Sequence, residues 1–298
     1  VCFAPYRDGK YGVYVQEERR MSGNQINISV LHVVGAMNRG GAETFLMNTL
    51  RNIDKDRFTF VFLCYGNNKF DYEDEIISLG SKIVRIPDVK VVGILRHIRD
   101  IKQVIQNENI HMVHVHTHYN SMFSVIAARL AKLKVRIVHS HTTESGSDQG
   151  IIRRIYSVVA KIMININTTN YVACSTGAGR ALFGNRKKIQ IIHNGIDVSK
   201  FRYSKNIRRL MREQLRISDD TFVIGHIGRF ESQKNHDFLV DVYKEIYEKN
   251  QNTVVLLAGR GVEETRIKER VRALGLERNV IFLGVRTDIP DLMQAMDI

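Results

Sequence analysis

The feature of this sequence that most constrains its fold is a regular alternation of short apolar runs with amphipathic helical patterns. Toward the C-terminal end, apolar runs at 222–227, 254–258 and 280–284 are each followed by such a pattern. Strands that alternate with helices form a parallel sheet, because each helix returns over the sheet in a right-handed crossover. A similar alternation starts with the apolar run 26–34. We therefore predict an α/β protein built on parallel sheets.

Composition narrows the expected partners to anions. The formal net charge is +13 and the isoelectric point is about 9.7, which suits nucleic acid, acidic lipid or phosphorylated small molecules. The sequence has no basic block with interleaved aromatic residues and no zinc-finger pattern, so we expect no nucleic acid partner. Cys2, Cys64 and Cys174 form no C-x-x-C motif, which indicates a reducing compartment without a disulfide framework or a metal site.

Membrane-spanning and secretory patterns are missing from the sequence. No apolar run approaches the length that crosses a bilayer, and the first residues lack the apolar core of a signal peptide. We therefore expect a cytoplasmic protein that could touch the inner face of the membrane.

The stretch Phe222 to His236 combines a strand, a glycine turn and the start of a helix. Gly228 ends the apolar run, Arg229 and Lys234 flank the turn, and Asn235 is the expected helix cap. A helix that starts at the carboxyl end of a parallel strand binds anions. Arg and Lys together suit a diphosphate. An ordinary turn with two solvated cations is the alternative that these residues alone leave open.

A second glycine turn follows the apolar run 26–34. It contains Gly40, Gly41 and Glu43 and leads into a helical pattern. Glycines at such a turn let the backbone approach a ligand closely, although a surface turn has the same composition. The turn matches neither a Walker motif nor the G-x-G-x-x-G fingerprint, which disfavours a dehydrogenase.

Histidines follow two of the predicted strands. His114, His116 and His118 alternate with apolar residues, a spacing that permits a metal site. No Cys or carboxylate lies beside them, so we favour a structural or substrate-contacting role. The next strand, 135–143, carries His139 and His141 near its carboxyl end, where open α/β sheets place their sites.

The predicted helix 150–167 carries an apolar stripe with Arg153, Arg154 and Lys161 elsewhere on its surface. Such a helix could lie on an anionic membrane. A stripe of this kind is more often part of a core, and we favour the core.

Several of these motifs resemble one family. The segment Gly228 to Asn235 resembles the donor motif of retaining glycosyltransferases of family 4, which have the GT-B fold of two Rossmann-like parallel-sheet domains facing a cleft. The resemblance implies that Arg229 and Lys234 bind the diphosphate of a nucleotide sugar and that His141, or else His139, lies beside the reacting sugar. The residues it places around the donor and acceptor cleft are Gly40, Gly41, Glu43, His118, Asn194, Gly228 and Gly261.

The residue patterns and the resemblance together divide the chain. Residues 1–25 are an unassigned extension without a clear period, in which Met21 could be the natural start because a normal first strand follows it. The acceptor-side domain is expected at 26–198. A polar stretch at 199–220 is the expected linker, and 221–298 the expected donor domain. Family members continue with two Glu seven residues apart that bind the donor, so we expect the second domain to be incomplete and the chain to be truncated.

The activity that the resemblance implies is retaining transfer of a hexose from a nucleotide sugar to a lipid-linked or saccharide acceptor. The closest likeness is to bacterial enzymes of capsule and exopolysaccharide synthesis, which need no cofactor and no catalytic metal. Two alternatives remain at this stage. One is a non-catalytic fragment that binds only phosphate or a partner, and the other is a sugar-nucleotide epimerase of the GT-B type.

Overall fold

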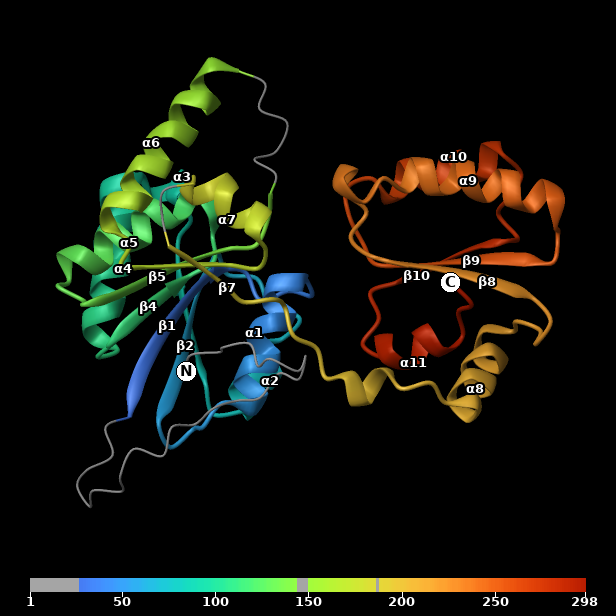
Figure 1. Ribbon diagram of the computed structural model, residues 1–298, viewed down its shortest axis with the longest axis horizontal. Coiled ribbons are helices and arrows are strands. Elements are labelled where there is room, and N and C mark those ends of the chain that lie inside the picture. The colour runs from blue at the N-terminus through green and yellow to red at the C-terminus, as the bar shows by residue number, and fades with distance from the viewer. Residues whose placement is uncertain (1–26, 144–149, 186–187) are drawn as a thin grey trace. The chain divides into compact units, whose positions relative to one another are not determined.

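The computed structural model describes residues 27–143, 150–185 and 188–298, which form two compact units. The first unit extends to Ile196 and the second starts at Asp197 (Figure 1). The predicted extension at 1–25 lies outside the described residues. Each unit contains its own parallel sheet, as predicted.

The first unit is organised around a seven-stranded sheet in the order β3-β2-β1-β4-β5-β6-β7. All of its neighbouring strands run parallel. The strands are β1 (Ile28–Gly35), β2 (Phe58–Tyr65), β3 (Lys82–Ile86), β4 (Met112–Val115), β5 (Val135–Ser140), β6 (Asn170–Ala173) and β7 (Ile189–Ile191). The strand order reverses between β1 and β4, and ligand sites of open α/β sheets lie beside such a reversal, at the carboxyl ends of the strands.

Helices cover both faces of this sheet. On β1, Leu31 and Val33 face one apolar cluster while Val30 faces the other, because side chains alternate along a strand. The helices α1 (Gly41–Asn52) and α2 (Glu73–Ser78) pack on the Val30 side. The helices on the Leu31 side are α3 (Val89–Val92), α4 (Ile94–Asn107), α5 (Ser121–Leu130), α6 (Ile151–Asn167) and α7 (Thr176–Phe183), and a short turn η1 (His118–Asn120) precedes α5.

The second unit has a three-stranded parallel sheet in the order β10-β9-β8. Its elements are η2 (Val198–Phe201), α8 (Lys205–Leu215), β8 (Phe222–Ile227), η3 (Ser232–Lys234), α9 (His236–Lys249), β9 (Thr253–Ala258), α10 (Glu264–Ala273), β10 (Val280–Gly284) and α11 (Ile289–Gln294). The helices α9 and α10 cover one face, and α8 and α11 cover the other. The central strand β9 is buried along its whole length.

The segment 199–220, predicted as the linker, instead contributes α8 to the second unit. Met211 lies in that unit's core, and the Arg212 side chain is 1% exposed. The Arg212 guanidinium donates to the carbonyl oxygens of Ser218, Asp219 and Thr221 and to Asp297 Oδ2 at 2.8 Å. Ile207, Met211 and Leu215 give α8 a short apolar face, and the buried arginine completes its packing.

The apolar stripe of α6, predicted as core, is exposed. Ile151, Ile152 and Ile155 are 75%, 84% and 59% exposed, and the helix contacts its unit through buried Ala160 and Ile164. The stripe therefore lies on the opposite side of the helix from the packed side. Among the described helices, none is both long and apolar enough to cross a membrane.

Replacing Arg212 with Ala should lower the unfolding free energy of the second unit by about 3–5 kcal/mol, because Asp297 and four carbonyl groups, including that of Ala295, lose a buried partner. The matched control is Arg209→Ala on the same helix, whose exposed pair with Glu213 spans 3.3 Å. That variant should lose less than about 1 kcal/mol. Chemical denaturation of both variants provides the measurement, and equal losses would contradict the role of Arg212.

Candidate functional site

In the second unit, the turn after β8 is held by the backbone of neighbouring strands. The Gly228 amide donates to the Ala258 carbonyl at 2.9 Å, and the Phe230 amide donates to the Arg260 carbonyl at 3.0 Å. A Cβ atom at Gly261 would overlap the Phe230 carbonyl, and one at Gly259 would overlap the Gly228 carbonyl. Glycine is therefore required at both positions of the β9 loop. Sequence reasoning identified Gly261 but not Gly259, although Gly259 stands two residues earlier in the same loop.

The two predicted donor cations lie on this turn. The Arg229 side chain is 63% exposed and pairs with Glu231 Oε1 at 3.0 Å. The aliphatic part of Lys234 lies across Gly228, where a Cβ atom would come within 3.3 Å of its Cδ and Cε atoms. Among the described residues, Lys234 has no acidic partner within ion-pair distance. An anion that binds here therefore has to displace only the exposed ion pair between Arg229 and Glu231.

The start of α9 differs from the prediction in one respect. Asn235 occupies the N-cap position, but it adopts the left-handed conformation with φ 47° and its side chain makes no capping hydrogen bond. Asn235 also ends η3, which fixes its backbone in this form. The cap side chain therefore leaves the first amides of α9 unsatisfied, and amides of that kind bind anions at helix starts.

Two neutral histidines support the turn from beneath. The His236 ring stacks on Phe230 at 4.2 Å between centroids and contacts His226 edge-on at 4.7 Å. Burial lowers the pKa of both imidazoles, and the Lys234 ammonium lowers that of His226 further. They support the turn by packing and add no charge near Arg229 and Lys234.

In the first unit, the predicted glycine turn lies at the start of α1. Gly40 is the N-cap residue and a Cβ atom there would meet the Glu43 carboxylate. Gly41 faces the Asn194 side chain, whose Nδ2 atom would lie 3.9 Å from an added Cβ. Asn48 Nδ2 also donates to the Gly195 carbonyl at 3.0 Å. The structure thus brings Gly40, Gly41, Glu43 and Asn194 together.

Five histidines from three adjacent strands gather on the α1 side of this sheet. They are His32 on β1, His114 on β4, His139 on β5, and His116 and His141 directly after β4 and β5. The His116 Nδ1 and His141 Nε2 atoms are 2.8 Å apart, and His116 Nε2 and His32 Nδ1 are 3.3 Å apart. The rings of His139 and His141 stack at 4.0 Å, and Phe45 of α1 packs against both. His32 was missed by sequence reasoning, although its position in the first strand is opposite His114.

His118 does not join this cluster. It starts η1 with φ 51°, and its ring contacts Tyr119 at 4.1 Å. The left-handed backbone ends the strand alternation on which the spacing of His114, His116 and His118 depends. The three residues therefore do not share one face.

Burial keeps the clustered imidazoles neutral. It lowers the pKa of His32 to about 3 and that of His141 to about 4, and those of His114 and His116 lie well below the ordinary value of 6.5. Neighbouring imidazoles lower the pKa of His139 further. Two sets of three have ring nitrogens within 4.8 Å of one another, His32 with His114 and His116, and His116 with His139 and His141. Neutral imidazole is the form that binds Zn²⁺ and similar ions, so these sets are the described residues best suited to a metal.

The comparison with known proteins matches both units in order. Residues 39–200 match the model of Glycosyltransferase Family 4, and residues 207–298 match that of Glycosyl transferases group 1. The chain belongs to glycosyltransferase family 4. A Bacillus subtilis protein named as glycosyltransferase EpsF is 35% identical to this glycosyltransferase over 274 residues, which cover 90% of this chain and 71% of EpsF.

Two further proteins extend the comparison. The capsular polysaccharide biosynthesis glycosyltransferase CapH of Staphylococcus aureus is 28% identical over 265 residues, 86% of this glycosyltransferase and 70% of CapH. The crystal structure of Anabaena HepE in complex with UDP and glucose superposes with a TM-score of 0.75 at 20% identity, over 91% of this chain and 73% of HepE. The predicted GT-B fold is confirmed.

The stability of this glycosyltransferase should fall as the pH drops below 6.5. In that range the clustered histidines bind protons in the unfolded protein but stay neutral in the folded protein. Each of these histidines therefore lowers the unfolding free energy by about 1.4 kcal/mol per pH unit. For His32 this continues down to its folded pKa of about 3. Urea denaturation at pH 7.5 and 5.5 measures the slope. In the variant His32→Leu, the unfolding free energy should change less with pH, by the contribution of one histidine. An unfolding free energy of the unsubstituted protein that does not change with pH would contradict the buried neutral cluster.

Proposed function

We propose that this glycosyltransferase moves a sugar from a nucleotide-sugar donor to a lipid-linked or saccharide acceptor in the synthesis of a surface polysaccharide. The observation that carries the proposal is the turn at Arg229 and Lys234, which glycine contacts hold rigid beside an uncapped helix start. The capsular role in the name of CapH and the UDP in the HepE complex support the polysaccharide product and the nucleotide donor.

The turn serves to hold a leaving group. The acceptor hydroxyl attacks the anomeric carbon and the bond from that carbon to the diphosphate breaks. The nucleoside diphosphate departs with the electron pair, and its departing oxygen takes the proton of the acceptor hydroxyl. Arg229, Lys234 and the first amides of α9 stabilise the charge that develops on the diphosphate oxygens. Fixed cations suffice for this task, so we propose a reaction without cofactor or catalytic metal.

His141 contacts the donor sugar in this proposal. Its Nε2 atom is held by His116, and its buried Nδ1 atom has no hydrogen-bond partner among the described residues. A substrate hydroxyl would supply the missing bond to Nδ1, which favours binding there. His116 is then a positioning residue, because it orients the ring of His141 without contacting the sugar. Retention of configuration and a hexose donor are parts of the same proposal, supported by the resemblance of the Arg229 motif.

The acceptor determines where the protein works. A lipid-linked acceptor is carried by a membrane, so we propose a cytoplasmic protein that binds peripherally to the inner membrane face. The net charge of +13 favours that contact with anionic lipid. A protein that only binds phosphate remains as the alternative and would hold nucleotide sugars without releasing nucleotide.

Replacing Arg229 and Lys234 with Ala together should weaken nucleotide-sugar binding by about 3–6 kcal/mol, because each charged hydrogen bond contributes about 1.5–3 kcal/mol. Calorimetric titration with UDP-glucose and UDP-galactose measures the change. Lys244→Ala, an exposed cation on α9, is the matched control and should bind as the unsubstituted protein does. Unchanged affinity in the double variant would remove the assignment of the donor site.

Replacing His141 with Ala should lower the rate of nucleotide release from the sugar donor by about 100-fold, in line with the loss of a preorganised contact to the reacting group. His116→Ala should lower the rate less, and His116→Asn should recover part of it because the amide can still hold His141 Nε2. The release of UDP over time gives the rates. Equal rates for the His141 variant and the unsubstituted protein would exclude this role.

A further inference from the structure

The outer face of α6 is the most extensive exposed apolar surface of a single helix in the described chain. Its members are 44–84% exposed and comprise Ile151, Ile152, Ile155, Val158, Val159, Ile162 and Ile166. They recur three or four residues apart and therefore share one side of the helix. Burying them would remove a large apolar area from water, so this face favours an apolar partner.

The opposite side of α6 anchors it to the first unit. Ala160 and Ile164 are fully buried, Asn167 Oδ1 accepts a hydrogen bond from Arg129 at 3.2 Å, and Tyr156 donates to Asn120 Oδ1 at 2.6 Å. Figure 1 shows the N-terminal end of α6 projecting beyond the other helices on its side of the sheet. The apolar face is therefore directed away from the core.

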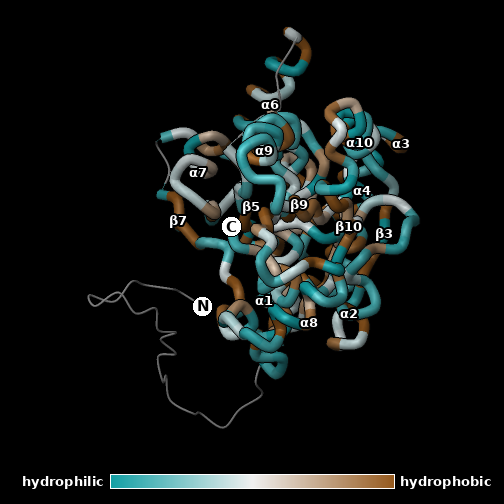
Figure 2. Tube along the Cα trace, turned by 90° about the vertical axis from the view of Figure 1, so that its right-hand side faces the viewer, coloured by the Kyte–Doolittle hydropathy of each residue, from teal (hydrophilic) through white to brown (hydrophobic). Residues whose placement is uncertain are grey.

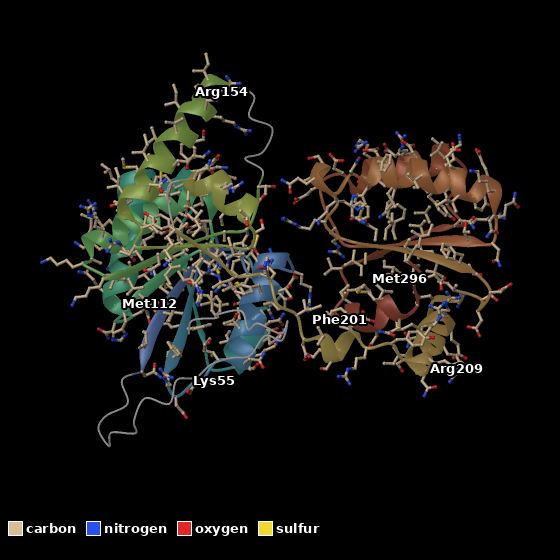
Figure 3. All side chains as sticks on the ribbon, in the orientation of Figure 1. Lys55, Met112, Arg154, Phe201, Arg209 and Met296 are labelled. Carbon is tan, nitrogen blue, oxygen red and sulfur yellow. The ribbon has the colours of Figure 1, made fainter. Side chains whose placement is uncertain are left out.

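Positive charge accompanies the apolar face, and negative charge is absent from the helix. The 17 residues of α6 include Arg153, Arg154 and Lys161 but no Asp or Glu. Figure 3 labels Arg154 near the projecting end, and Figure 2 shows hydrophobic and hydrophilic residues together there. An amphipathic helix with cations and an aliphatic face has the composition that binds anionic bilayers in the plane of the interface.

A second apolar group lies at the same edge of the sheet. Val91, Ile94 and Leu95, at the start of α4 and just before it, are 78%, 54% and 81% exposed, and Lys90 precedes them. Because α4 and α6 both begin after the carboxyl ends of parallel strands β3 and β5, their first residues emerge at one edge.

We propose that the outer face of α6 inserts into the interface of an anionic lipid bilayer. The charge of the helix favours this occupant over a second copy of the chain, because all three charged residues of α6 are cations. An anionic surface complements them, whereas a second α6 adds only further cations. With 17 residues and three cations, α6 lies in the membrane plane and does not cross it. The inference deepens the proposed function, on which its link to a lipid-linked acceptor rests, since it places the first unit on the surface that carries such an acceptor.

Vesicle flotation tests this face directly. The full chain should float with vesicles of phosphatidylglycerol and phosphatidylcholine, and Ile152→Asp with Ile155→Asp should weaken binding at least about tenfold. The matched control is Ile77→Asp on α2, because Ile77 is 58% exposed and Ile155 is 59% exposed. Replacing Arg154 and Lys161 with Gln should weaken binding roughly fivefold for each cation, and only where phosphatidylglycerol is present.

A fluorescent reporter gives a second measurement. The chain contains no Trp, so Ile152→Trp creates a single indole on α6, and Ile77→Trp creates one on α2. The emission of the α6 indole should shift to the blue on anionic vesicles while that of the α2 indole does not. This readout identifies the inserted residue independently of binding strength.

Four results would overturn the proposal. They are no flotation of the unsubstituted chain, equal flotation of the Asp double variant, no blue shift of the α6 indole, and a dimer in sedimentation velocity that the Asp double variant dissociates. The last result would assign the face to a second copy. Nucleotide-sugar binding is measured separately on the same proteins, so loss of lipid binding with intact nucleotide binding removes only this inference, and the reverse removes only the proposed transfer reaction.

Discussion

Parallel strand pairing is the constraint on which the rest of this structure depends. It gathers the carboxyl ends of all strands at one edge of each sheet. The features to which we assign functional roles lie there: the turn at Arg229 and Lys234, the glycine turn before α1, and His141. The glycines make the edge tight enough to hold its shape. Gly259 and Gly261 let the loop after β9 contact the backbone of the turn after β8. A Cβ atom at either position would overlap a carbonyl group of that turn.

The histidine cluster can be buried only while its imidazoles are neutral. Burial of five imidazoles between the sheet and α1 is tolerable near neutral pH, because each ring is neutral and stacks on its neighbours. Protonation would place like charges within about 4–6 Å in a dry environment. The same neutrality is compatible with the proposed contact to an uncharged sugar, since in that proposal the positive charge near the donor comes from Arg229 and Lys234.

Much of the fold could be predicted from the sequence, because strand runs and helix stripes are local patterns. The parallel sheets follow from the apolar runs that alternate with helical patterns, and the turn at Arg229 and Lys234 follows from the glycine and polar residues after the run 222–227. Three features could not be predicted. The burial of Arg212 depends on carbonyl groups and a carboxylate brought together only by folding. The exposure of the α6 stripe depends on which side of the helix packs on its unit, and Ala160 and Ile164 lie on the packed side. The cluster around His116 depends on strand order, which joins β1, β4 and β5 although they are far apart in sequence.

The two hydrogen bonds that join His32, His116 and His141 couple their protons. With all three rings neutral, each bond needs one donor, so His116 can carry its proton on only one side. If Nδ1 of His116 is protonated, His141 must present a donor at its own Nδ1; if Nε2 is protonated, His141 presents an acceptor and His32 holds its proton among Phe60 and Phe62. The position of the proton on His116 therefore decides whether His141 Nδ1 is a donor or an acceptor, and the cluster can exchange one state for the other without changing its net charge.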